Sequence, residues 1–331
     1  MKGVITFGEV MMRLSCENYG RLRQARSFNV LYVGSEASVA SSLALSGITS
    51  AHVTCLPDDD LGAAAAGTLA HYSVDTAHIV FKKGRIGVFF LEYGASIRAP
   101  KIIYDRFESV FARLNPAEFD WKSILKDAQW FHWSGITPAI SAEAAQACLE
   151  AVQTASSMGI TVSGDINYRR NLWQYGKSPR EVMPELIRHS HVLVAGVTDL
   201  ENCLGITGET WEEACRNAAS QYPNITKITA TSRKTITASH NILSGMMWNG
   251  NEILTTREFD LRPIVDRVGA GDAFMAGFIF ASITGKTDQD IIDYATAAGA
   301  MKHTIEGDVN VASVAEITAL LEGENVGKLL R

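Results

Sequence analysis

The residues that could do chemistry lie together near the end of the chain, in the stretch DRVGAGDAFMAGFIFA over residues 266–281. Here Gly269, Ala270 and Gly271 predict a tight turn, and Asp272 opens a run in which apolar residues recur at helical spacing. The first turn of a helix presents amide N–H groups without intrahelical partners and the positive end of the helix dipole. Such amides could hold the charge that builds on a phosphoryl group, while the Asp272 carboxylate takes the proton of an attacking hydroxyl.

The same pattern has a purely structural explanation, in which the glycines form a strand-to-helix turn and Asp272 is the N-cap of the helix. Two commoner phosphate-binding motifs are disfavoured. Bulky Phe274 stands where a Rossmann fingerprint needs a third small residue, and no G-x-x-x-x-G-K-[ST] loop occurs. The stretch GAAAAGT over residues 62–68 has the glycine spacing of such a loop but no lysine, so it predicts an alanine-rich helix.

The elements that must position this stretch alternate along the chain between strands and helices. Apolar runs predict strands over residues 4–10, 160–164, 191–195 and 225–231 and at the start of 130–140, and helices after Ser35, from Ser141 to about Met158, from Asp272 and over 291–304. This alternation predicts an α/β fold with a mostly parallel central sheet that is flanked by helices.

The segment over residues 84–106 has a different texture from the segments around it. Short β-rich pieces are separated by Gly94 and Pro100, which indicates a small β lid inserted between α/β units. A lid over a site of phosphoryl transfer would exclude water and so suppress hydrolysis of a nucleotide.

The composition is that of an ordinary globular enzyme with a full hydrophobic core. The net charge of −6 provides no basic field, so a nucleic-acid partner is not expected. The N-terminus lacks the apolar core of a signal peptide and no apolar run reaches membrane-spanning length, so we expect a cytoplasmic protein without a membrane partner. Five scattered cysteines without C-x-x-C spacing argue against a disulfide framework or a zinc site.

The D-x-x-G-A-G-D stretch resembles the C-terminal signature of the ribokinase/PfkB family of sugar kinases. The resemblance implies a ribokinase-like three-layer sandwich with a mostly parallel central sheet and a small β-rich lid. It implies one kinase domain over residues 1–331, whose lid is drawn from about residues 11–32 and 85–106. It also implies ATP-dependent phosphoryl transfer with Mg²⁺, with Asp272 as the base and the amides of the turn as the anion hole.

Other motifs resemble one branch of the family, the 2-keto-3-deoxygluconate kinases. The stretch RIGVFFLEYGASIRAPKIIYDR over residues 85–106 is similar to the lid of this branch, in which a Y-x-R triplet and an aromatic residue contact the sugar acid. Tyr104 and Arg106 match the triplet, and Phe89 stands at the aromatic position, where tyrosine is common. The D-x-N-x-R motif that ends at Arg169 is also typical of the branch.

A charge argument supports a sugar acid as the substrate. A neutral sugar needs no guanidinium in its pocket, whereas a carboxylate matches the planar fork of arginine. The resemblance to this branch then implies that the terminal hydroxyl of 2-keto-3-deoxy-D-gluconate is phosphorylated. In the family's G-x-x-x-N-V-A region, Gly34 matches the glycine and Ser38 replaces the asparagine. The expected substrate-binding residues are Gly34, Phe89, Tyr104, Arg106, Arg169 and Asp272.

The nucleotide and metal sites also follow from the resemblance. The expected neighbours of the nucleotide are Thr231, Ser232, Arg233, Gly269 and Gly271. The first three follow a predicted strand at the point where the family commonly carries G-x-x-G, which this chain lacks. Asp199 takes the place of a family glutamate that positions magnesium through water, and Gly196 replaces a family asparagine, so we expect Asp199 to act on the metal.

Two other functions stay open. One is a kinase of the same fold that acts on a neutral sugar such as fructose or ribose, or on a nucleoside. The other is a non-catalytic sensor of sugar acids, which would account for the departures at Ser38, at Gly196 and at the missing G-x-x-G. A Rossmann dehydrogenase lacks its fingerprint. Because an exposed β lid offers an edge that partner subunits often cover, we expect a homo-oligomer formed through the lid.

Overall fold

The central layer of the computed structural model, which describes residues 3–323, is a ten-stranded sheet. Its strands are β1 (Gly3–Phe7), β4 (Ser50–Pro57), β5 (Ile79–Lys82), β8 (Ala128–Ser134), β9 (Thr161–Asp165), β10 (Val192–Val194), β11 (Lys227–Thr237), β12 (His240–Trp248), β13 (Ile253–Thr255) and β14 (Phe259–Leu261). The order is β13-β12-β11-β10-β9-β8-β1-β4-β5, and β14 pairs with β12. All pairs from β5 to β11 are parallel, and only the pairs made by β12 are antiparallel. The predicted mostly parallel sheet is confirmed.

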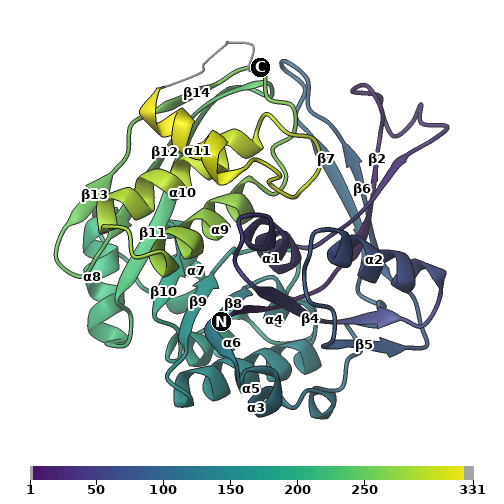
Figure 1. Cartoon of the computed structure of the whole chain (residues 1–331), viewed down its shortest axis with the longest axis horizontal. Coiled ribbons are helices and arrows are strands. Elements are labelled where there is room, and N and C mark those ends of the chain that lie inside the picture. The colour runs from purple at the N-terminus through teal and green to yellow at the C-terminus, as the bar shows by residue number, and fades with distance from the viewer. Residues whose placement is uncertain (1–2, 324–331) are drawn as a thin grey trace.

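Helices cover both faces of this sheet (Figure 1). They are α1 (Ser35–Leu45), α2 (Asp60–His71), α3 (Trp121–Ile124), α4 (Thr137–Ile140), α5 (Ala142–Ser157), α6 (Pro179–Ile187), α7 (Val197–Leu204), α8 (Trp211–Gln221), α9 (Ala270–Ile283), α10 (Asp288–Lys302) and α11 (Val314–Glu322), with a short 3₁₀ turn η1 (Pro116–Glu118). Successive residues of a strand point to opposite faces. Val4 therefore packs in a core with α1, α9, α10 and α11, whereas Ile5 and Phe7 pack in a core with α5, α6, α7 and α8. The predicted three-layer sandwich is confirmed.

A second, four-stranded sheet forms a separate arm, seen at the upper right of Figure 1. Its strands, in the order β3-β2-β6-β7, are β3 (Asn29–Val33), β2 (Met11–Ser15), β6 (Gly87–Glu92) and β7 (Lys101–Asp105). The small β-rich sheet predicted from the sequence is confirmed, while its action as a lid and the single-domain organisation stay predictions. Apolar residues on one face of this arm pack against Val268, just before the glycine turn.

Helix α9 carries Asp272 in its first turn, as predicted, but it begins two residues earlier than expected, at Ala270. Its N-cap Gly269 has φ 81°, a conformation that favours glycine. A Cβ on Gly269 would also lie 1.9 Å from the carbonyl oxygen of Asp308. Gly269 therefore both starts the helix and allows the backbone of another segment to pack closely against it.

Two further expectations can be compared with the structure. Each of the five cysteines is buried and unpaired, as expected of reduced packing residues. No helix within residues 3–323 has the length and apolar character needed to cross a membrane.

Candidate active site

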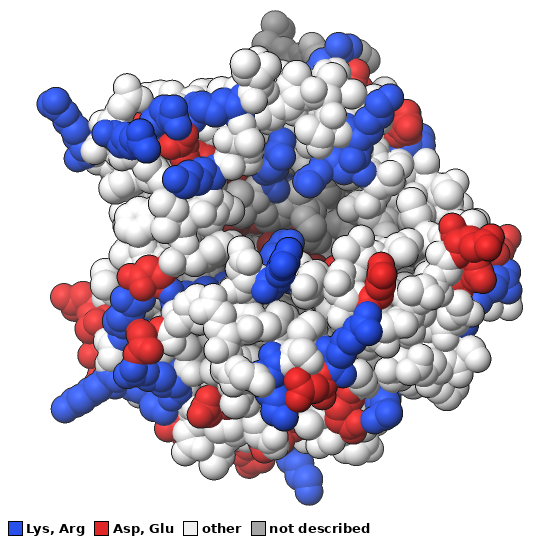
Figure 2. All heavy atoms as spheres, turned by 180° about the vertical axis from the view of Figure 1, so that it is seen from behind, with Lys and Arg blue, Asp and Glu red and all other residues white. Residues whose placement is uncertain are grey.

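A cavity of about 640 Å³ lies where the N-termini of α1 and α9, the end of β9, the middle of β11 and the small sheet meet. The predicted site residues that line it are Gly34, Phe89, Tyr104, Arg106, Arg169, Thr231, Arg233, Gly269, Ala270, Gly271 and Asp272. Figure 2 shows a hollow on the face opposite to that of Figure 1, with Lys and Arg side chains around its rim and acidic atoms visible inside it. Most of the residues selected from the sequence are thus brought together.

Two predicted residues do not line this cavity. Ser232 lies between Thr231 and Arg233 on β11, and alternation along the strand turns its side chain to the other face. Asp199 is in the first turn of α7, where its two carboxylate oxygens accept hydrogen bonds from the Gly196 amide at 2.9 Å and the Tyr168 amide at 3.2 Å. Its geometry is that of a helix cap.

The proposed base Asp272 is held by a side chain from another helix. Ser35, the first residue of α1, donates a hydrogen bond from Oγ to Asp272 Oδ1 at 2.5 Å. Burial raises the pKa of Asp272 to about 7, and the Asp308 and Glu36 carboxylates act in the same direction, while Ser35 and Arg169 oppose them. A carboxyl whose pKa lies near neutrality is well matched to general-base catalysis.

The backbone beside Asp272 offers free donors. Within residues 3–323, the amides of Gly269, Gly271 and Asp272 have no hydrogen-bond partner, whereas the Ala270 amide donates to the Arg267 carbonyl oxygen at 3.3 Å. Of the amides from Gly269 to Asp272 that were predicted to form the anion hole, only the Ala270 amide is therefore occupied. Unpaired amides at the positive end of a helix form an anion site.

The two arginines predicted to bind a sugar acid have different surroundings. Arg106 is 3% exposed and forms an ion pair with Glu9, with Nη2 2.6 Å from Oε2. Ser109 donates to the other oxygen of Glu9 at 2.5 Å. Arg169 is exposed and, within the described chain, has no ion-pair partner. The charge of Arg106 is already neutralised, so of these two arginines Arg169 is the one available to a carboxylate.

The arm forms one wall of the cavity with its aromatic residues. The rings of Phe89 and Tyr104 lie with their centroids 5.7 Å apart, and the Arg106 guanidinium lies over the Tyr104 ring at 5.7 Å. On the opposite side, Gly34 approaches so closely that a Cβ there would lie 2.1 Å from the Glu9 carbonyl oxygen. The cavity is thus lined by aromatic rings from the arm and, at Gly34, by backbone without a side chain, which is compatible with a small polar ligand.

A second acidic residue, Asp165 at the end of β9, also faces the cavity. Burial raises its pKa to about 7, and the Asp199 and Asp272 carboxylates add to the effect. No group of three or more His, Cys, Asp or Glu residues in the described part of the chain could hold a metal ion. The protein therefore provides no metal cage of its own here.

The far end of the cavity is basic. Arg233 and Arg267 line it, and neither has an acidic partner among residues 3–323. Burial and the neighbouring Arg233 lower the pKa of Arg267. His303 donates from Nδ1 to the Gly299 carbonyl oxygen at 2.7 Å, while its buried Nε2 has no partner. Arg267 Nη2 donates to the Ala238 carbonyl oxygen at 2.9 Å, so its charge is not offset by a carboxylate. Two guanidinium groups without acidic partners in one cavity favour a polyphosphate.

Sequence reasoning missed several residues that line the cavity. They are Glu9, Ser35, Glu36, Asp165 and Arg267. A signal existed for Glu9 and Asp165, since each lies at or just beyond the carboxyl end of a parallel strand, where α/β sheets bind ligands. Glu36 is buried and accepts hydrogen bonds from the Ser134 amide at 3.1 Å and Thr137 Oγ1 at 2.7 Å.

Comparison with known proteins agrees with this geometry. A family model described as pfkB family carbohydrate kinase matches residues 1–313. A 2-dehydro-3-deoxygalactonokinase from Haloferax volcanii is 30% identical over 324 residues, which cover 98% of this chain and 98% of that protein.

Solved structures are also similar. The 2-dehydro-3-deoxygluconokinase from Thermotoga maritima has a TM-score of 0.92 at 39% identity, over 98% of this chain and 100% of that one. A PfkB family carbohydrate kinase from Listeria grayi has a TM-score of 0.93 at 33% identity, over 97% of this chain and 100% of that one. The predicted resemblance is confirmed. This chain belongs to the pfkB family of carbohydrate kinases and is a phosphotransferase with an alcohol group as acceptor.

Proposed function

We propose that this kinase phosphorylates the terminal hydroxyl of a 2-keto-3-deoxy sugar acid, with 2-keto-3-deoxy-D-gluconate as the first candidate and ATP as the donor. The observation that carries the proposal is Arg169, a guanidinium that has no acidic partner among the described residues and lines the same cavity as Asp272. A carboxylate at one end of a substrate would pair with Arg169 while the hydroxyl at the other end meets Asp272. The names of similar proteins, a galactonokinase and a gluconokinase of the 2-dehydro-3-deoxy series, support this choice.

Each of the cavity residues would have its own role in the reaction. Asp272 accepts the proton of the attacking hydroxyl, and Ser35 fixes the direction of its carboxylate. The amides of Gly269, Gly271 and Asp272 hold the phosphoryl group in transfer. Gly34, Phe89 and Tyr104 enclose the sugar and exclude water.

The basic end of the cavity is the proposed nucleotide site. Arg233 and Arg267 fit the phosphates of ATP, and Thr231 lies beside Arg233 on the same face of β11. When bound, ATP with its Mg²⁺ supplies the phosphoryl group and offsets part of its charge. Because residues 3–323 form no group of metal ligands, we expect Mg²⁺ to arrive on the nucleotide. The Asp199 carboxylate is taken up by two amides, so we expect at most a distant effect on the ion.

A substrate panel tests the proposal. ATP consumption with Mg²⁺ is measured with 2-keto-3-deoxygluconate, its galactonate epimer, fructose, ribose and a nucleoside. We expect a 2-keto-3-deoxy acid to give the highest kcat/KM. A higher kcat/KM for a neutral sugar or a nucleoside would replace the proposal with the alternative kinase. Binding of the acid without any ATP consumption would point to the sensor.

A further inference from the structure

One arginine of the small sheet is buried beneath the glycine turn. Arg13 lies on β2 and is 0% exposed. Its Nη2 donates to Asp266 Oδ2 at 2.5 Å and to the Tyr93 hydroxyl at 2.6 Å, and its Nη1 forms an ion pair with Asp308. A buried guanidinium is costly unless it is paired and hydrogen-bonded, so these contacts fix the side chain in one place.

The two carboxylates that Arg13 joins belong to two segments next to the turn. Asp266 precedes the turn in the chain, and Asp308 lies against it in space. Asp266 Oδ1 accepts from the Val268 amide at 3.0 Å, and its Oδ2 accepts from the Gly307 amide at 3.2 Å. The backbone of Asp308 packs against Gly269 so closely that no Cβ fits between them. Arg13 therefore connects the two segments that hold Gly269, the first residue with a free amide in the anion site.

The network is balanced in charge. Lys302 is also 0% exposed and donates from Nζ to the carbonyl oxygens of Asp266 at 3.3 Å and Ile305 at 2.9 Å. Two buried cations thus face the carboxylates of Asp266 and Asp308. Because the Asp308 carboxylate raises the pKa of Asp272, loss of one cation would change the electrostatic environment of the proposed base.

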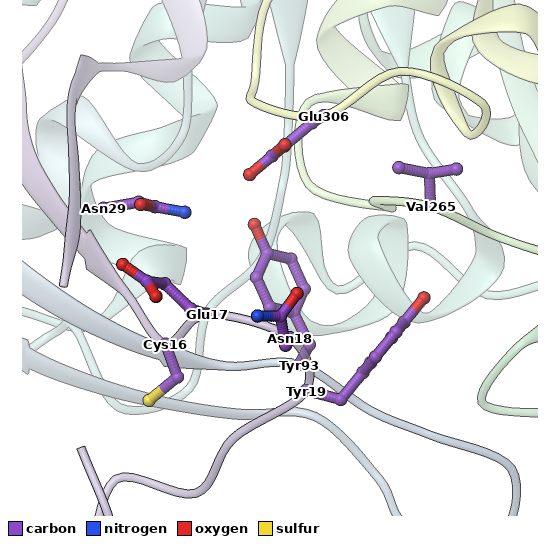
Figure 3. Close-up of a pocket in the computed structure, with 8 residues that line it drawn as sticks. All are labelled: Cys16, Glu17, Asn18, Tyr19, Asn29, Tyr93, Val265 and Glu306. Carbon is purple, nitrogen blue, oxygen red and sulfur yellow. The ribbon is translucent and has the colours of Figure 1, made fainter. Parts of the chain in front are cut away.

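The network also reaches the surface. Figure 3 shows Tyr93, the third partner of Arg13, in the wall of a surface pocket, with its hydroxyl pointing between Asn29 and Glu306. The same hydroxyl lies 3.3 Å from Asp266 Oδ2. On β2, Arg13 is in register with Phe89 of β6, which lines the substrate cavity. The position of the arm and the position of the turn are thus joined through one side chain.

We propose that Arg13 is a positioning residue for phosphoryl transfer. Through its contacts, the position of the arm determines the position of the anion-binding turn and the electrostatic environment next to that turn. The inference rests on the proposed function, since it takes Asp272 as the base and the turn as the anion hole. It goes beyond that function because Arg13 is absent from the cavity wall and touches neither substrate.

The test compares Arg13→Gln with Arg98→Gln. Arg98 lies in the same arm, where it pairs with Glu92 at 2.6 Å and donates to the Tyr19 carbonyl oxygen at 2.7 Å. Within residues 3–323 it has no hydrogen bond or ion pair to the turn. We expect Arg13→Gln to lower kcat on the order of ten- to hundredfold, with the sugar KM changed less than about threefold, because a small displacement of the turn affects the reacting geometry more than binding. Arg98→Gln is expected to stay within about twofold of the wild type.

A pH profile separates positioning from simple loss of stability. The charged and polar groups around Asp272 are Ser35, Glu36, Asp165, Arg169, Lys302 and Asp308. Arg13→Gln removes the cation that faces Asp308, which should raise the pKa of Asp272. The part of the pH profile in which kcat/KM rises from its low value in acid (the acid limb) should therefore shift to higher pH. The double variant Arg13→Gln/Asp308→Asn restores the balance of charge and should return the limb toward its original position.

A wild-type kcat and pH profile in Arg13→Gln would overturn the inference, and so would equal losses in the Arg13 and Arg98 variants. If Arg13→Gln does not fold, Arg13→Lys and Arg98→Lys give the same comparison of kcat, and equal losses would again overturn the inference. Because lysine keeps the charge but not the forked contacts, kcat should fall in Arg13→Lys while the acid limb stays in place. The substrate panel keeps the two proposals apart. If another substrate is preferred, the Arg13 comparison is made with that substrate, so the proposed function can fail while the inference stands.

Discussion

At the scale of single residues, the surroundings of Asp272 give it a high affinity for a proton at neutral pH. Burial raises its pKa to about 7, and the Asp308 and Glu36 carboxylates act in the same direction. Ser35 donates to one carboxylate oxygen and leaves the other free to meet a hydroxyl. At neutral pH, a base with this pKa is ionised in a substantial fraction of molecules and still has a high affinity for the proton that it accepts.

The first prediction concerns pH. We expect kcat/KM for the sugar acid to rise with pH through about 7 and to level off above it, because Asp272 must be ionised to accept a proton. Burial also raises the pKa of Asp165 and of Glu36 to about 7, so the limb belongs to a coupled cluster of carboxyl groups. Initial rates between about pH 5.5 and 9 measure this dependence of kcat/KM on pH. A limb centred near 4 would contradict this account of Asp272.

The second prediction concerns recognition of the carboxylate. Arg169→Gln should raise KM for the sugar acid on the order of ten- to hundredfold, since a charge-assisted hydrogen bond is lost, and should change KM for a neutral sugar of the same length by less than about twofold. The neighbouring Arg170 is exposed and lies outside the cavity wall, so Arg170→Gln is the matched control. Equal increases for both substrates would remove the carboxylate assignment.

At the scale of elements, the first turn of α9 determines the site because it carries both the free amides and the carboxylate. The two glycines of this turn have different tasks. Gly269 has φ 81° and packs against the Asp308 backbone, whereas a Cβ on Gly271 would meet no atom within 4 Å. Gly269 is thus required by the backbone, and Gly271 leaves room for a ligand.

The third prediction follows from that difference. Gly269→Ala should lower the free energy of unfolding by about 2 kcal/mol or more, because the alanine would be strained at this φ and would collide with the Asp308 carbonyl group. Gly271→Ala should leave the free energy of unfolding within about 0.5 kcal/mol of the wild type. Denaturant unfolding of both variants measures this contrast. Similar losses in the two variants would show that the close approach of Asp308 is not what requires glycine.

The sequence predicted the parts of the site that depend on local signals. Glycine spacing and apolar periodicity predicted the turn and the helix after it, and the strand-like runs predicted the central sheet. The start at Ala270 was missed, because small residues continue a helix as readily as they form a turn. Ser232 was expected to contact the nucleotide from a loop after the predicted strand. It lies instead within β11, where the alternation of side chains turns it to the other face.

At the scale of the whole molecule, the site is assembled by contacts between distant segments. Ser35 and Asp272 are 237 positions apart, and Arg13 and Asp308 are 295 positions apart. No local pattern marks such partners, so the pairing of Arg106 with Glu9 and the burial of Arg13 could not be predicted from spacing. The folded chain also holds Asp272, Asp165 and Glu36 near one another, which costs stability whenever they are ionised.

The fourth prediction tests this cost. Because the pKa of Asp272 is higher in the folded chain than in the unfolded chain, the native state binds the proton more tightly, and the free energy of unfolding falls as pH rises from about 4 to 7. Asp272→Asn removes the charge, so it should increase the free energy of unfolding by about 1–3 kcal/mol at pH 8 and change it little at pH 4. Thermal unfolding of the wild type and of Asp272→Asn at pH 4 and pH 8 measures this difference in the free energy of unfolding. The same change at both values would exclude ionisation as its cause.

The most direct test of the account is the turnover of Asp272→Asn with ATP, Mg²⁺ and the preferred sugar acid. Loss of the positioned base should lower kcat by about a hundredfold or more, while KM for the sugar acid stays within about threefold of the wild type. A variant that keeps near-normal kcat would contradict the claim that Asp272 and the free amides of α9 act together on the reacting hydroxyl and phosphate.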